Sequence, residues 1–169
     1  MTKNLDTDGL CSIAHRYDLF YIDLWGVVHN GIKLYEGAIG TLKELKRNNK
    51  DFVLLTNAPR PNDTVKKFLE KMGMEEELRD HVFTSGEAAL NYLKKSYSSK
   101  KFFHIGPPRD FDLFNPFKKN KSSDLVDSEY LLCTGLFDDH KNDLNYYKNL
   151  FEAHILSLIH IWRCRRGLR

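Results

Sequence analysis

The sequence predicts a doubly wound α/β domain with a parallel sheet, and three observations carry that prediction. Short apolar runs alternate along the chain with segments whose apolar residues recur every three or four positions. This alternation of strands and helices is typical of parallel sheets with crossover helices. Polar residues stand where the apolar runs end, and ligands bind at the carboxyl ends of strands in such sheets.

The first strand and helix are predicted from the apolar pattern near the N-terminus. Residues 17–28, YDLFYIDLWGVV, have apolar side chains on both faces of an extended chain, which predicts a buried parallel strand that ends near Gly26. Residues 37–48 have apolar side chains at helical spacing with polar ones between them, and this predicts a helix. The inner face of that helix would consist of Ala38, Ile39, Leu42 and Leu45.

Two further strand and helix pairs follow. Residues 52–55, FVLL, predict a buried strand that ends at TNAPRP, where two prolines break the pattern. Residues 64–72 predict an amphipathic helix, with Gly73 as its C-terminal cap. Its apolar face would consist of Val65, Phe68, Leu69 and Met72. Residues 81–85, HVFTS, predict a third strand, and a helix begins at Ser85.

After Lys100 the pattern is weaker. Residues 101–106 and 129–137 are expected to form strands, and the stretch between them, residues 107–124, is expected to be irregular. Residues 142–154 have the periodicity of a helix.

Polar side chains follow three neighbouring strands of the predicted sheet. They are Asp23 after the first strand, Thr56 and Asn57 after the second, and Thr84 and Ser85 after the third. Because parallel strands end at the same edge of a sheet, these residues are expected to form one small polar site. An aspartate at the end of a buried strand must be compensated by donors or a cation, or it caps the following turn.

Composition and charge exclude several classes of protein. The formal charge of +3 comes from four arginines in residues 156–169, and residues 1–155 carry −1, so nothing marks the chain for nucleic acid. No apolar run is long enough to span a membrane, and the N-terminus does not have the form of a signal peptide. Three widely spaced cysteines favour neither a disulfide framework nor a metal cluster. We therefore expect a cytoplasmic protein.

The last fourteen residues differ in composition from the rest of the chain. Before position 156 the chain has 17 lysines and 5 arginines, whereas residues 156–169, LSLIHIWRCRRGLR, have four arginines and no lysine. Residues 156–166 resemble a translated transposon-end adaptor from a sequencing library, with a stop codon read as Trp162. We expect a non-native tail; the alternative is a natural strand followed by a basic segment.

The segments DLWGVVHNG and LLTNAPRP together resemble motifs one and two of the haloacid dehalogenase superfamily. The resemblance continues through LYEGAIGTLKELKRNNKDFVLLTN and VFTSGEAALNYL to CTGLFDD, and it is strongest to the class IIA branch with its para-nitrophenyl-phosphatase-like enzymes. It implies an incomplete Rossmann-like core in residues 1–84. Residues 85–155 would be the truncated beginning of an inserted α/β cap domain, and residues 156–169 the tail.

The resemblance also implies roles for individual residues. Asp23 would be the nucleophile that forms an aspartyl-phosphate. Mg²⁺ would be held by the Asp23 carboxylate and the Trp25 carbonyl. Thr56 would bind a phosphate oxygen through its hydroxyl, and main-chain N–H groups around Trp25, Gly26 and Asn57 would complete the phosphate site.

The sequence departs from the family pattern at Trp25. Most phosphatases of the superfamily have a second aspartate there, which protonates the leaving oxygen, and an indole cannot do this. General acid catalysis contributes about 10²- to 10⁴-fold, so esters with good leaving groups should be affected least. His29 is a candidate substitute acid; the alternative is a loop residue near the site.

We therefore expect a Mg²⁺-dependent phosphatase that acts on a small phosphorylated metabolite. The lysine and the later acidic motif that the superfamily needs would lie beyond this chain, so the chain itself is expected to be inactive. The alternative is a non-catalytic or weakly catalytic binding protein that keeps the phosphate site. No nucleic acid or membrane partner is expected, and the sequence predicts neither the substrate nor the oligomeric state.

Overall fold

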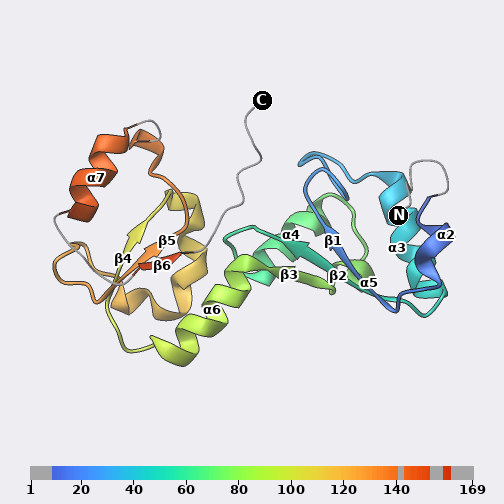
Figure 1. Cartoon of the computed structure of the whole chain (residues 1–169), viewed down its shortest axis with the longest axis horizontal. Helices are drawn as coiled ribbons and strands as arrows, with labels where there is room; N and C mark the ends of the chain where they lie inside the picture. Colours follow the sequence, from blue (N-terminus) through green and yellow to red (C-terminus); the bar gives the residue numbers. More distant parts are fainter. Residues whose placement is uncertain (1–8, 141–142, 153–157, 161–169) are drawn as a thin grey trace. The chain divides into compact units, whose positions relative to one another are not determined.

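The computed structural model describes residues 9–140, 143–152 and 158–160. The chain divides into two compact units, of which the first comprises residues up to 56 together with 66–83. The second comprises 57–65 and the chain from residue 84 onwards. Figure 1 shows each unit as a small sheet with helices packed beside it.

The first unit holds a three-stranded sheet in the order β1-β2-β3. Its elements are α2 (Cys11–Ala14), β1 (Leu19–Asp23), α3 (Glu36–Arg47), β2 (Asp51–Thr56), α4 (Asn62–Lys71, which begins in the second unit), α5 (Glu76–Arg79) and β3 (Val82–Thr84). Strands β1 and β2 are parallel, in a register that runs from Leu19 opposite Asp51 to Asp23 opposite Leu55. The predicted α/β class with a parallel sheet is confirmed.

The first strand is shorter than predicted. The strand predicted from the apolar run that begins at residue 17 was expected to end near Gly26, whereas β1 ends at Asp23 and the apolar residues that follow belong to a loop. Leu24 and Val28 are nevertheless buried, because the loop folds back and carries them into the interior. The apolar residues of this segment therefore indicate burial of the loop and do not indicate a longer strand.

One face of this sheet is buried and the other is exposed. Phe52 and Leu54 are buried, as are Leu42 and Leu45 of α3, which contacts β2, and Leu69 of α4. On the opposite face the side chains of Leu19, Tyr21, Leu55 and Phe83 are between 39% and 69% exposed. These four residues, called here the bare face, show that β1 is not the strand buried on both sides that the sequence predicted.

The second unit holds a three-stranded sheet in the order β4-β5-β6, parallel throughout. Its elements are α6 (Ser85–Ser96), β4 (Phe102–Ile105), the 3₁₀ segment η1 (Pro108–Asn120), β5 (Tyr130–Cys133), η2 (Asp138–His140), α7 (Leu144–Glu152) and β6 (Leu158–His160). Alternate residues of its strands enter two separate apolar clusters. One contains Phe102, Tyr130 and Leu132 with residues of α6 and η1, and the other contains Ile105 and Leu131 with Tyr147 of α7.

One expectation for this unit needs correction. Residues 107–124 are not simply irregular, because η1 covers most of them, with non-helical backbone at Phe114 and Phe117 on either side of Pro116. Within residues 156–169, Leu158–His160 pair in parallel with Leu131–Cys133. The non-native origin of this tail stays a prediction. The rest of residues 156–169 lies outside the described part of the chain.

The helices of the described part are short or polar relative to what a lipid bilayer demands. None of them combines the length and the apolar character needed to cross a membrane.

Candidate active site

The carboxyl ends of β1 and β2 bring two of the predicted site residues to one edge of the sheet. Asp23 is the last residue of β1 and Thr56 is the last residue of β2. The parallel register sets Asp23 opposite Leu55, so Thr56 lies one residue further along the neighbouring strand. This is the edge at which parallel sheets bind ligands.

Asp23 is exposed and not buried as its position in an apolar run suggested. Its Oδ1 accepts a hydrogen bond of 2.8 Å from the amide of Leu24, which follows it in the chain. The carboxylate therefore needs no buried counter-charge, since water reaches it. A solvent-accessible carboxylate that is held by a backbone hydrogen bond is suited to attack on a ligand that arrives from solvent.

The loop after β1 is closed by its own backbone. The carbonyl of Leu24 accepts hydrogen bonds from the amides of Val28 at 2.9 Å and His29 at 3.1 Å. Gly26 has a φ of +76° and donates its amide to the carbonyl of His29 at 2.7 Å. The Gly26 N–H, expected in the phosphate site, is thus used by the loop in this conformation.

His29 belongs to this loop, and its side chain is buried. Its Nδ1 accepts a hydrogen bond of 2.9 Å from the amide of Gly31, so the ring proton of the neutral form is on Nε2. Burial lowers the pKa of His29, and the charge of Asp23 opposes that effect only in part. A neutral, buried imidazole is a poor proton donor, so the geometry favours the loop role over the substitute acid.

Trp25 lies on the surface of the same loop, with 52% of its area exposed. Its ring meets His29 edge-on, with 5.5 Å between ring centroids and planes at 88°. A Cβ atom added to Gly31 would come within 2.6 Å of Cη2 and Cζ3 of the indole. The absence of a side chain at Gly31 therefore makes room for the Trp25 ring.

The third pair of predicted polar residues, Thr84 and Ser85, stabilises the start of α6 in the second unit. Thr84 caps α6, because its hydroxyl oxygen accepts the Glu87 amide at 2.9 Å and its hydroxyl donates to the Arg60 carbonyl at 2.5 Å. The hydroxyl of Ser85 donates to the carbonyl of Ala58 at 3.0 Å. The backbone of Arg60 also approaches Gly86 so closely that no Cβ would fit. The segment after β2 thus covers the start of α6.

Asn57 follows Thr56 in the chain and is grouped with the second unit. Its part in phosphate binding stays a prediction, as does that of Thr56.

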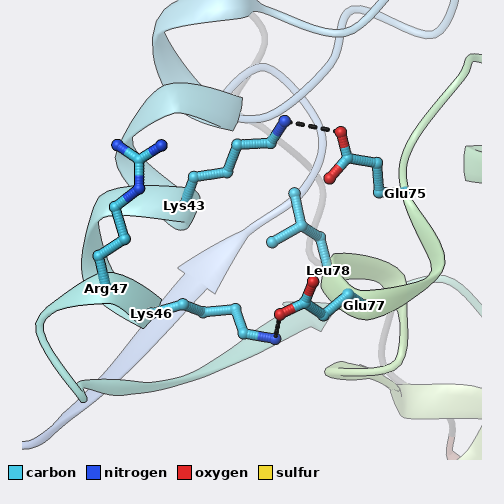
Figure 2. A pocket seen from close by; sticks show the side chains of 6 residues that line it. All are labelled: Lys43, Lys46, Arg47, Glu75, Glu77 and Leu78. Carbon is cyan, nitrogen blue, oxygen red and sulfur yellow. Dashed lines mark hydrogen bonds and ion pairs between the residues drawn. The ribbon is translucent and has the colours of Figure 1, made fainter.

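A polar hollow, separate from the residues around Asp23, lies between α3 and the chain around α5 (Figure 2). In Figure 2 the ammonium of Lys43 reaches Glu75, with N and O 2.6 Å apart, and Lys46 reaches Glu77. Arg47 pairs with Glu44 of its own helix at 3.2 Å. Because each cation has an acidic partner, the hollow joins α3 to α5 and offers no unbalanced charge to a ligand.

The oxygens that could hold Mg²⁺ are few in this part of the chain. Within residues 9–140, 143–152 and 158–160, no three His, Cys, Asp or Glu side chains gather into a group that could hold a metal ion. Asp23 supplies one hard carboxylate, which suits Mg²⁺ in kind, but an octahedral ion needs more ligands. The described residues therefore fit one part of such a site.

Sequence reasoning missed two residues that shape this site. Gly31 was read as part of the DLWGVVHNG motif only, although its φ of +90° and its contact with Trp25 require a glycine. Phe68 was expected on the inner face of α4, yet it is 42% exposed and its ring lies 5.7 Å from that of His29. The NG pair was the available signal for a turn at Gly31.

Comparison with known proteins places the chain in a family. The family model of the haloacid dehalogenase-like hydrolases matches residues 20–116, which is more than half of the chain and includes both strand ends described above. The chain belongs to this family. The resemblance seen in the sequence motifs is thereby confirmed.

The relatives of this chain are longer than the chain itself. The sugar-phosphatase AraL of Bacillus subtilis is 36% identical over 86 residues, which are 50% of this chain and 31% of AraL. A haloacid dehalogenase-like hydrolase from Brucella suis is 28% identical with a TM-score of 0.74, covering 88% of this chain and 55% of the other. A possible sugar phosphatase from Cytophaga hutchinsonii, 19% identical with a TM-score of 0.68 and the same coverages, shares the fold.

Proposed function

We propose that the whole protein hydrolyses phosphate monoesters of small metabolites, with a sugar phosphate as the first substrate to try. The observation that carries this proposal is the exposed carboxylate of Asp23 at the carboxyl end of β1, beside the end of β2 with Thr56. The family match spans both residues. The likeness to AraL, named a sugar-phosphatase, supports the choice of substrate.

In the proposed reaction one carboxylate oxygen of Asp23 attacks phosphorus, the P–O ester bond breaks, and the leaving oxygen keeps the bond electrons and takes a proton from water to leave as the alcohol. Water then attacks the aspartyl-phosphate, releases inorganic phosphate and restores the carboxylate. Asp23 is exposed, so the substrate can reach it without the opening of a buried cavity. The hydroxyl of Thr56 would hold a phosphate oxygen next to this carboxylate.

Mg²⁺ is the proposed cofactor, with the Asp23 carboxylate and the Trp25 carbonyl as the ligands from this chain. Bound there, the ion would neutralise the repulsion between carboxylate and phosphate. The described residues supply only this part of the ligand set, and we propose that the 169-residue chain by itself turns over little or no substrate.

The competing function is a binding protein that keeps the phosphate site without efficient catalysis. The observation that favours it is Trp25, because an indole cannot protonate the leaving oxygen and the buried His29 is no ready substitute. Proton transfer would then fall to water, at a cost of about 10²- to 10⁴-fold in rate.

The deciding experiment is an Asp23→Asn substitution in the whole protein, assayed for phosphate release from glucose 6-phosphate and phenyl phosphate with Mg²⁺ present. We expect a loss of at least about 10³-fold, since an amide is not a nucleophile here. Asp18→Asn is the matched control, because Asp18 is 99% exposed at its side chain and contacts Lys50 only at the start of the sheet. Its activity should match the native protein.

Two results would contradict the proposal. Equal turnover by the native and Asp23→Asn proteins would remove Asp23 from the chemistry. Absence of turnover in both, combined with equal affinity for inorganic phosphate by calorimetry, would establish the binding protein instead.

A further inference from the structure

We propose that the indole of Trp25 is a stacking surface for the organic part of the substrate, and that it selects phosphate esters whose alcohol carries a ring. This inference rests on the proposed function, because it assigns a substrate class to the site at Asp23. It gives Trp25 a positive role in place of the missing acid.

The first step is that Asp23 and Trp25 are both exposed and lie two residues apart in the chain. Asp23 ends β1 and Trp25 follows in the loop, with Trp25 52% exposed and Leu24 between them 1% exposed. Two residues of chain span at most roughly 7 Å. A phosphate at Asp23 would therefore leave its ester group within reach of the indole.

The second step is that the indole is held in place. Gly31, with φ at +90°, lies against the six-membered part of the ring, and His29 meets it at 88°. His29 is itself fixed by the Gly31 amide and by edge-on contact with Phe68 at 5.7 Å and 75°. A side chain that is already ordered loses little entropy when a ligand stacks on it.

The third step is chemical. About half of the surface of Trp25 is open to water next to a polar site. An acidic or small polar side chain at this position would expose less apolar surface. The face of an indole attracts flat rings and the C–H faces of ring compounds more than it attracts open chains. Contacts of this kind are worth about 0.5–1.5 kcal/mol, which corresponds to about 2- to 12-fold in affinity.

The test separates stacking from leaving-group chemistry. Benzyl phosphate, glucose 6-phosphate and n-butyl phosphate all release a primary alcohol, so the missing acid affects them alike, whereas only the first two carry a ring. We measure kcat/KM of the whole protein and take the ratio of each ring ester to the butyl ester. We expect Trp25→Ala to lower these ratios by about 3- to 10-fold and Trp25→Phe to retain most of them.

Ile32→Ala is the matched control, because Ile32 is 85% exposed on the same loop and has no place in the proposed stack. Its ratios should equal those of the native protein. Trp25→Ala with unchanged ratios, or with equal losses for ring and butyl esters, would overturn the proposal.

A second measurement keeps the proposal testable if no ester is hydrolysed. Benzylphosphonate and butylphosphonate are titrated calorimetrically into the native, Trp25→Ala and Trp25→Phe proteins with Mg²⁺ present. A preference for the ring compound that disappears only in Trp25→Ala supports stacking even where the phosphatase proposal has failed. Equal affinity of the native protein for both compounds rejects it.

Discussion

The two sheets of this chain are built on the same plan, yet they differ in how their faces are covered. Both have three strands, and parallel pairing is described in each. In the second unit, neighbouring strand residues such as Leu131 and Leu132 are both buried, one in each apolar cluster. In the first unit, Phe52 and Leu54 are buried while the bare face, which includes Tyr21, meets solvent.

The comparison shows that the apolar pattern of a strand does not by itself determine whether both of its faces are buried. That depends on which other elements pack against the sheet. YDLFYID and EYLLC are apolar on both faces to a similar degree, and the first of them was predicted to be a strand with two covered sides. It is the strand formed by EYLLC that has both faces covered, because α6 and η1 supply residues to one cluster and α7 supplies residues to the other. The bare face carries the composition of an interior surface, and the relatives of the chain are more than half as long again as the chain itself.

The largest expected effect comes from truncating one leucine in each sheet. Leu132→Ala in the second unit should lower the free energy of unfolding by about 2–5 kcal/mol, because Leu132 is fully buried and its removal leaves a cavity. Leu19→Ala on the bare face should cost less than about 1 kcal/mol, since Leu19 is 44% exposed. Urea unfolding of the chain measures both. Similar losses would show that the bare face is covered in solution.

The same pair of variants sharpens the comparison in the whole protein. If residues beyond this chain cover the bare face, Leu19→Ala should there approach the cost of Leu132→Ala.

An effect of intermediate size is expected from pH, through a buried imidazole in the second unit. His104 is 4% exposed, its Nε2 lies 2.8 Å from Oγ1 of Thr134, and burial lowers its pKa from 6.5 to about 4, with a smaller contribution from Lys121. Between these values the unfolded chain binds the proton and the folded unit does not. Stability therefore falls as pH falls from about 6.5 to 4, by on the order of 3 kcal/mol.

The contribution of His104 is isolated by comparing the native chain with His104→Gln in urea unfolding at pH 7 and pH 4.5. The native chain should lose more stability than the variant on acidification. Parallel pH profiles would exclude His104 as the source.

The smallest effect contrasts two helical glycines and should differ in sign. Gly86→Ala at the start of α6 should cost about 1–3 kcal/mol, because the new methyl group would collide with the backbone of Arg60. Gly40→Ala within α3 should stabilise the chain by about 0.5–1 kcal/mol, since nothing lies within 4 Å of the added atom. Thermal unfolding distinguishes a rise from a fall. A gain at both positions would show that the Arg60 segment is free to move.

The helices and the inner strands could be predicted because their signals are local. Residues 52–55 became the centre of β2, and the helix predicted over residues 37–48 is α3, one residue earlier at each end. The end of β1 was misjudged because Leu24 and Val28 are apolar for a different reason, namely burial of the loop. The helix predicted to begin at Ser85 does begin there, and Thr84 is the residue that caps it.

The site was predictable only in part, for a physical reason. That Asp23 and Thr56 end neighbouring strands follows from the order of strands, which the sequence carries. The contact between Trp25 and Gly31 and the burial of His29 depend on the conformation of one loop. The spacing of residues in the sequence does not predict that conformation. The pair of His104 and Thr134 joins residues 30 positions apart, which only the register of β4 and β5 brings together.

The bare face also has a consequence for biosynthesis. Its last residue, Phe83, leaves the ribosome early, and every further hundred residues of chain take about 5–20 s to be made. During that time an apolar sheet face is presented to solvent next to β1, which is an edge strand of the sheet in the described part of the chain. A chaperone that recognises short aromatic and aliphatic segments would find its binding site in Leu19 and Tyr21 before the polypeptide is finished.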